Sequence, residues 1–134
     1  MDRYLAVLDQ LPTPQSGDPV VLSALAFKAS LGRKPAGMDQ AIQFLKQALA
    51  LGTTDPVDYS LLGELLALRH RPSEAIQVLQ AGLVLDPYYI PYYELLAKSY
   101  INMGNLGQAG EVVKQGLQQF PESHVSRELQ EKGR

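Results

Sequence analysis

Apolar residues along the chain recur with the three- and four-residue spacing of amphipathic helices, and the predicted helices come in pairs. One helix is expected from Pro56 to about Leu68, because Asp55 is suited to capping a helix and proline to its first turn. A second is expected to be capped by Ser73 and to end before Pro87. The short polar interruption between them predicts two antiparallel helices joined by a turn.

The same pattern returns at a period of 34 residues, which is typical of helical repeat proteins. The repeat is carried by a series of small, bulky, small and proline positions: Ala75, Leu79, Gly82 and Pro87, which return as Ala109, Val113, Gly116 and Pro121. One period earlier, Ala41, Leu45 and Ala48 occupy the first three of these columns. The chain is therefore predicted to be a stack of helix pairs.

Glycines stand in the middle of the predicted helices, where they weaken helix formation. Gly63 and Gly82 each cost roughly 1 kcal/mol relative to alanine. We expect them at points where two helix backbones approach closely, because a larger side chain would hold the helices apart.

The first helix pair contains three extra residues. Its first helix, which follows Asp18, matches the second pair at an offset of 37, whereas its second helix, from Ala41, matches at 34. We expect the insertion in a surface loop around residues 32–37, where added length costs little closure entropy, with Asp39 capping the next helix.

These columns resemble the tetratricopeptide repeat (TPR) family. The family's run of aromatic, Leu, small and aromatic residues is met by Tyr93, Leu96, Ala97 and Tyr100, and less completely by Tyr59, Leu62, Gly63 and Leu66. The first pair departs from the family at Leu22, Ala29 and Thr53, the last of which stands in the proline column. The resemblance implies an all-α fold, a right-handed α-solenoid of antiparallel helix pairs that forms a TPR-like superhelix.

A single TPR domain is expected over residues 1–134. It is divided into a partial repeat or N-terminal cap helix, three repeats of which the first holds the insertion, and a C-terminal capping helix: residues 1–12, 19–55, 56–89, 90–123 and 124–134.

In the family that the chain resembles, the first helix of each pair lines a concave groove that receives a peptide or helix of another protein. The resemblance assigns a mixed set of side chains to the partner-binding groove: Ser23, Phe27, Ser60, Glu64, Leu68, Glu94, Lys98 and Asn102. The same columns also contain Val20, Ala24, Val57, Leu61, Pro91 and Leu95. The expected function is a non-catalytic protein-protein interaction module or scaffold; the alternative is a homo-oligomerising or spacer segment of a larger multidomain protein.

One branch of the family holds a C-terminal carboxylate of a chaperone with Lys and Asn side chains on three first helices. The corresponding places here hold residues without a cationic donor: Ser23, Phe27, Leu61, Pro91 and Leu95. We therefore expect no carboxylate-clamp chaperone binding. Lys98 stands one turn after Glu94, and an exposed ion pair between the two is the simplest interpretation.

Four tyrosines fall within residues 86–93. Tyr93 is expected in the core, whereas Tyr88, Tyr89 and Tyr92 either cover the turn between repeats or form a contact patch, since tyrosine is favoured at interfaces.

Composition narrows the class of function. The 12 Lys and Arg residues against 14 Asp and Glu residues give a net charge of −2, so no basic footprint for nucleic acid is present. Five cationic or titratable residues lie in the predicted inter-helix turns and are interpreted as solvated side chains near helix ends: Arg33, Lys34, Arg69, His70 and Arg71.

No catalytic constellation is found in the sequence. The chain has no cysteine, its two histidines, His70 and His124, are isolated, and it contains no phosphate-binding glycine loop. We expect no enzymatic activity, no cofactor and no metal site. The sequence contains no uninterrupted apolar run of about 18 residues, the length that would predict a membrane-spanning helix. A soluble protein is expected, with the cytoplasm slightly favoured and an exported parent protein left open.

Overall fold

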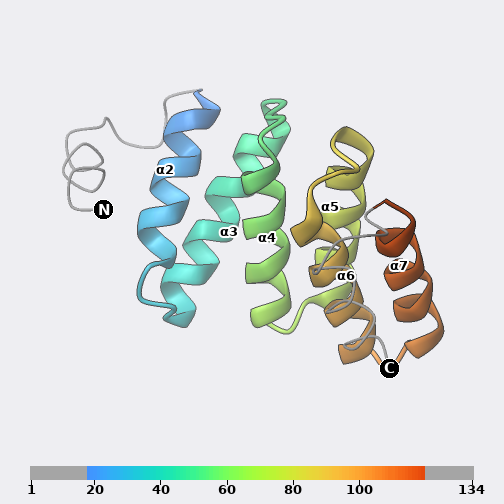
Figure 1. The fold of residues 1–134 in the computed structure, drawn as a ribbon. Coiled ribbons are helices and arrows are strands. Elements are labelled where there is room, and N and C mark those ends of the chain that lie inside the picture. The colour runs from blue at the N-terminus through green and yellow to red at the C-terminus, as the bar shows by residue number, and fades with distance from the viewer. Residues whose placement is uncertain (1–17, 120–134) are drawn as a thin grey trace. The chain divides into compact units, whose positions relative to one another are not determined.

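The computed structural model describes residues 18–119, and the elements within this range are α-helices joined by short turns (Figure 1). In chain order they are α2 (Pro19–Ser30), α3 (Pro35–Ala50), α4 (Pro56–Leu68), α5 (Pro72–Leu85), α6 (Ile90–Asn102) and α7 (Leu106–Gln119). The predicted all-α class is confirmed. The partial repeat or cap helix expected at residues 1–12 and the capping helix expected at 124–134 lie outside the described residues.

The described residues form two compact units, 18–58 and 59–119. The first contains α2, α3 and the first residues of α4. The second contains the rest of α4 together with α5, α6 and α7. No helix within residues 18–119 combines the length and the apolar character needed to cross a membrane.

Side chains just before three helices determine where those helices begin. Asp18 Oδ1 accepts a hydrogen bond from the Val20 amide at 2.9 Å, and Asp55 Oδ1 accepts one from Val57 at 3.0 Å. Asn105 does the same at the start of α7, at 3.3 Å. Each bond satisfies a backbone N–H that has no partner within its helix. The predicted helix starts directly after Asp18 and Asp55 are confirmed.

Two predicted caps are wrong. Ser73 lies inside α5, which begins at Pro72, and Asp39 lies inside α3, which begins at Pro35. Proline suits the first position of a helix because its φ is already helical and its missing N–H is not needed there. A proline therefore starts each of these helices, and no side chain caps them.

The surface loop predicted around residues 32–37 is only partly right: residues 32–34 lie in the turn after α2, whereas residues 35–37 form the first turn of α3. The helix α3 has 16 residues, whereas α5 and α7 have 14 each. A Cβ on Gly37 would lie 2.3 Å from the carbonyl oxygen of Ala29 in α2. Because no side chain fits at that distance, glycine is required where the added turn of α3 meets the α2 backbone.

The turns inside the helix pairs share a residue in the left-handed conformation. It is Arg33 (φ 50°) after α2, His70 (φ 62°) after α4 and Gly104 (φ 76°) after α6. Only the third turn uses glycine, the residue that adopts this conformation without a steric cost. Helix-ending hydrogen bonds hold the second and third turns, from the Arg71 amide to the Leu66 carbonyl and from Asn105 to Tyr100, both at 2.8 Å.

Gly63 and Gly82 lie against side chains of neighbouring helices, so the predicted close approach of two backbones is wrong at these two positions. A Cβ on Gly63 would lie 2.6 Å from Leu79, and one on Gly82 would lie 2.5 Å from the ring of Tyr92. Leu79 and Tyr92 are both fully buried. Each glycine thus provides room for a large side chain of another helix.

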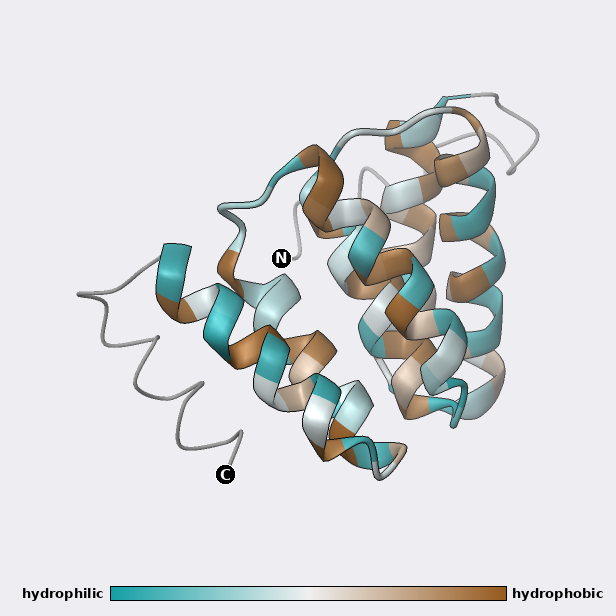
Figure 2. Ribbon diagram, turned by 90° about the vertical axis from the view of Figure 1, so that its right-hand side faces the viewer, coloured by the Kyte–Doolittle hydropathy of each residue, from teal (hydrophilic) through white to brown (hydrophobic). Residues whose placement is uncertain are grey.

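The two faces of α7 differ in polarity. Along α7, hydrophilic residues form a stripe on the side that Figure 2 shows, while Ala109, Val112, Val113 and Gly116 are buried. In α7 this division of faces is the amphipathic pattern typical of a helix at a protein surface.

Candidate functional site: a groove between α4 and α6

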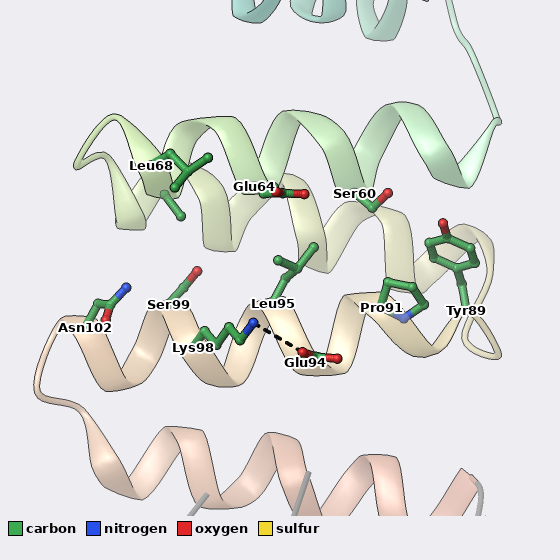
Figure 3. Close-up of a pocket in the computed structure, with 11 residues that line it drawn as sticks. Ser60, Glu64, Leu68, Tyr89, Pro91, Glu94, Leu95, Lys98, Ser99 and Asn102 are labelled. Carbon is green, nitrogen blue, oxygen red and sulfur yellow. Dashed lines mark ion pairs between the residues drawn. The ribbon is translucent and has the colours of Figure 1, made fainter. Parts of the chain in front are cut away.

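A groove with a volume of about 530 Å³ runs between α4 and α6 in the second unit (Figure 3). Its lining combines acidic, basic, hydroxyl, amide and apolar side chains: Ser60, Glu64, Ala67, Leu68, Tyr89, Pro91, Glu94, Leu95, Lys98, Ser99 and Asn102. The groove thus offers both apolar surface and several polar groups that could fix the orientation of a ligand.

Six of the eight residues assigned to partner binding line this groove: Ser60, Glu64, Leu68, Glu94, Lys98 and Asn102. Pro91 and Leu95, which share their columns, also line it. Ser23 and Phe27 are residues of α2 in the first unit.

The charged residues of the groove stand on both helices. Glu64 projects from α4, Glu94 projects from α6, and Leu95 lies between them in Figure 3. Lys98 Nζ lies 3.2 Å from Glu94 Oε1, which confirms the predicted ion pair. The Lys98 side chain is 53% exposed, so water screens the pair and its contribution to stability is small.

Apolar side chains provide contact area at both ends of the groove. Leu68 is 43% exposed at the end of α4, and Tyr89 is half-buried just before α6. The Tyr89 ring packs edge-on against Tyr92, with 4.9 Å between the ring centroids. Since Tyr92 is fully buried beside Gly82, the core holds the Tyr89 ring in place.

Ser99 lines the groove although only 1% of its surface is exposed. Figure 3 shows its hydroxyl directed toward α4, and no hydrogen bond of this hydroxyl is found among the described residues. A buried polar group without a partner is rare and costs free energy. The resemblance did not assign Ser99 to the groove, but its spacing from Leu95 and Asn102 places it on the same helix face.

The tyrosines of residues 86–93 divide between core and surface. Tyr92 and Tyr93 are buried, Tyr89 lines the groove, and Tyr88 is 67% exposed. The Tyr93 hydroxyl donates to the Pro87 carbonyl oxygen at 2.6 Å. Burial raises the pKa of Tyr93 above its ordinary value, and Tyr88 and Asp86 add to the rise.

A second concave surface lies at the turn between α4 and α5. Ala67, Leu68 and Asn102 belong to it as well as to the groove, and His70 and Pro72 complete its lining. The groove therefore continues toward this turn. In the same turn, Arg71 Nη2 forms an ion pair with Glu74 Oε2 of α5 at 2.6 Å.

The α2 residues assigned to partner binding have other contacts. Ser23 Oγ donates to Asp58 Oδ1 at 2.5 Å, and Thr53 Oγ1 donates to Asp58 Oδ2 at 2.8 Å. The Ser23 hydroxyl thus helps satisfy a carboxylate that is only 3% exposed. Phe27 is half-buried, and its carbonyl oxygen accepts from Ser30 Oγ at 3.0 Å.

No family model and no curated protein sequence matches the chain. Solved structures do match it. A chain of the Cut9-Hcn1 hetero-tetramer of the APC/C superposes with a TM-score of 0.78 at 20% identity, over 96% of this chain. The match spans only 26% of that longer chain.

Two further structures match along most of both chains. The first TPR of Spaghetti (RPAP3), bound to an HSP90 peptide, gives a TM-score of 0.68 at 17% identity and covers 88% of this chain and 92% of its own. YrrB, described as a TPR protein with an unusual peptide-binding site, gives 0.73 at 17% identity, with coverages of 98% and 75%. The chain therefore has the tetratricopeptide-repeat fold, an α-solenoid of helix pairs.

Proposed function

We propose that the protein is an interaction module that binds a peptide or helix of a partner protein in the groove between α4 and α6. The observation that carries this proposal is the groove itself, in which six of the eight side chains assigned to binding from the sequence share one lining. Exposed apolar surface at Leu68, together with charged and hydroxyl groups, matches what a peptide presents.

Two structures with the same fold support a peptide as the ligand class. The RPAP3 structure holds the HSP90 peptide SRMEEVD, and the YrrB structure is described by its peptide-binding site. For the present chain we expect no carboxylate clamp, because Pro91 and Leu95 supply no cation to the groove.

Selection from a peptide display library, followed by groove substitutions, tests the proposal. The affinity of a selected ligand is expected to fall roughly tenfold in Leu68→Ala, since truncating an apolar side chain that contacts the ligand costs about 1 kcal/mol or more. Leu106→Ala is the matched control, because that leucine is 65% exposed and lies outside the groove lining. Equal affinities for the two variants would show that the ligand binds elsewhere.

A second candidate function, self-association, is favoured by one surface. The end of α5 and the following turn expose Val84 (84%), Leu85 (50%) and Tyr88 (67%). Side chains of this kind suit an interface between copies. Light scattering over a concentration range tests it. Association that Val84→Ser and Tyr88→Ser abolish would favour a homo-oligomerising segment, whereas a monomer at every concentration would exclude it.

A further inference from the structure

The groove between α4 and α6 has a lining that discriminates between peptides by charge. It contains two carboxylates, Glu64 and Glu94, and one ammonium group, Lys98, so the charges of its lining sum to −1. The ammonium group already lies 3.2 Å from Glu94. An acidic side chain or a free C-terminal carboxylate would meet more negative than positive charge here.

The apolar part of the lining is arranged beside these charges. Figure 3 places Leu95 between Glu64 and Glu94, and Leu68 lies farther along the same side of α4. A ligand that seats an apolar side chain on the two leucines therefore brings the neighbouring residue next to a carboxylate. A Lys or Arg at that place gains an ion pair and keeps its aliphatic stem on apolar surface.

The buried Ser99 hydroxyl is an independent sign of a ligand. It is almost fully buried, it is directed into the groove, and it has no hydrogen-bond partner among the described residues. A peptide group lying against it would satisfy the hydroxyl, which can both donate and accept. This requirement favours a ligand with an exposed main chain over one that presents side chains alone.

Building on the proposed function, we propose that the groove selects an extended, internal segment of a partner in which a basic residue stands next to an apolar one. The apolar side chain lies on Leu68 and Leu95, the cation lies beside Glu64 and Glu94, and the main chain hydrogen-bonds to Ser99.

Fluorescence anisotropy with synthetic peptides tests the charge preference. The probes are short, acetylated and amidated peptides in which a Leu is followed by Lys, by Gln or by Glu, together with the Glu peptide carrying a free C-terminal carboxylate. We expect the Lys peptide to bind several-fold more tightly than the Gln peptide and the acidic peptides to bind most weakly. The preference is expected to shrink as salt is added.

Opposite substitutions in the groove sharpen this test. Glu94→Gln is expected to weaken the Lys peptide roughly threefold to tenfold, whereas Lys98→Met, which removes the competing cation, is expected to strengthen it. Ser99→Ala is expected to lower affinity for every peptide about threefold without lowering thermal stability. Ser73→Ala, an exposed serine outside the groove, is the matched control.

The outcomes separate this inference from the proposed function. Tighter binding of the acidic or free-carboxylate peptides, still lost in Leu68→Ala, would overturn the charge preference and leave the groove as a peptide site. Binding of no peptide, or binding indifferent to Leu68→Ala and Ser99→Ala, would overturn both. An affinity that Ser99→Ala leaves unchanged, with the charge preference intact, would remove only the main-chain contact.

Discussion

Two successive repeats place opposite chemistry in the same column. Asp58 and Tyr92, 34 residues apart, are both buried, with 3% and 0% of their surface exposed. Asp58 forms a polar junction in the first unit, where its carboxylate accepts from Ser23 and Thr53. Tyr92 forms an aromatic junction in the second unit, where its ring lies against Gly82 and Tyr89.

Two other columns of the repeat also differ between the polar and the aromatic junction. The aromatic junction has Gly82 and Pro87, whereas the polar junction has Ala48 and Thr53 in the corresponding columns. Glycine makes room for the tyrosine ring, and threonine supplies the hydroxyl that the buried carboxylate needs. The absence of proline at Thr53, a departure from the repeat pattern, thus has a physical reason. In these two repeats the residues of the three columns therefore differ as a set.

The largest expected effect is the loss of the aromatic ring. Tyr92→Ala is expected to lower the free energy of unfolding by about 3–5 kcal/mol, because it leaves a cavity beside Gly82. Denaturant unfolding followed by circular dichroism measures it. Tyr88→Ala, which truncates an exposed tyrosine of the same segment, is expected to cost less than about 0.5 kcal/mol. Similar losses in the two variants would contradict the buried role of Tyr92.

Adding a methyl group at Gly82 is expected to lower the free energy of unfolding somewhat less than removing the Tyr92 ring. Gly82→Ala should destabilise by about 1–3 kcal/mol through overpacking, since the new methyl group would lie 2.5 Å from the Tyr92 ring. In a Tyr92→Leu background the same substitution should be nearly neutral or stabilising, because the ring is gone and alanine favours helix. A double-mutant cycle with no coupling between the two sites would refute the paired exchange of columns.

The polar junction is expected to be weaker than the aromatic one but still measurable. Asp58→Ala should lower the free energy of unfolding by about 1–3 kcal/mol, because the hydroxyls of Ser23 and Thr53 lose their acceptor. Glu111→Ala, at an exposed carboxylate of α7, serves as the control and is expected to change stability by less than about 0.5 kcal/mol. If urea unfolding gives the two variants equal stability, the hydrogen bonds to Asp58 contribute nothing.

The smallest effect concerns the hydroxyl of Tyr93. Tyr93→Phe should cost about 1 kcal/mol at neutral pH, since the hydrogen bond to the Pro87 carbonyl is lost. Burial raises the pKa of Tyr93 in the folded protein, so its contribution is complete below the ordinary value of about 10 and is lost as pH rises through the higher folded value. The wild-type protein should therefore lose more thermal stability above about pH 10 than Tyr93→Phe does. Parallel alkaline profiles would contradict this assignment.

Much of the groove lining follows from the amino-acid sequence and its resemblance to a known family. The resemblance to the TPR family assigns Glu64, Leu68, Glu94 and Lys98 to a groove by their columns in the repeat, and these four residues line the groove between α4 and α6. The three- and four-residue spacing of one helix face also reaches Ser99, yet a serine between Leu95 and Asn102 carries no signal of its own in the sequence. Only the folded chain shows that this side chain is buried and that its hydroxyl has no hydrogen-bond partner within residues 18–119.

Helix ends were predicted unevenly for a related reason. Asp55 caps α4 as expected, because the side chain contacts the backbone two residues on and the signal is local. Asp39 and Ser73 carry the same type of side chain but follow a proline that already starts the helix. In α3 and α5 a proline and a capping side chain both favour a helix start, and the helix begins at the proline.

The sequence by itself determined the helix pairs and their period, because helical periodicity is a property of neighbouring residues, and the resemblance of its columns to a known family pointed to the groove side chains. Only the tertiary structure decided what the glycines accommodate. Gly37 avoids the Ala29 carbonyl oxygen, and Gly82 makes room for Tyr92. The tertiary structure also decided that the Asp58 carboxylate accepts hydrogen bonds from two hydroxyl groups. These roles depend on distances between atoms of different helices and turns, which no local pattern specifies.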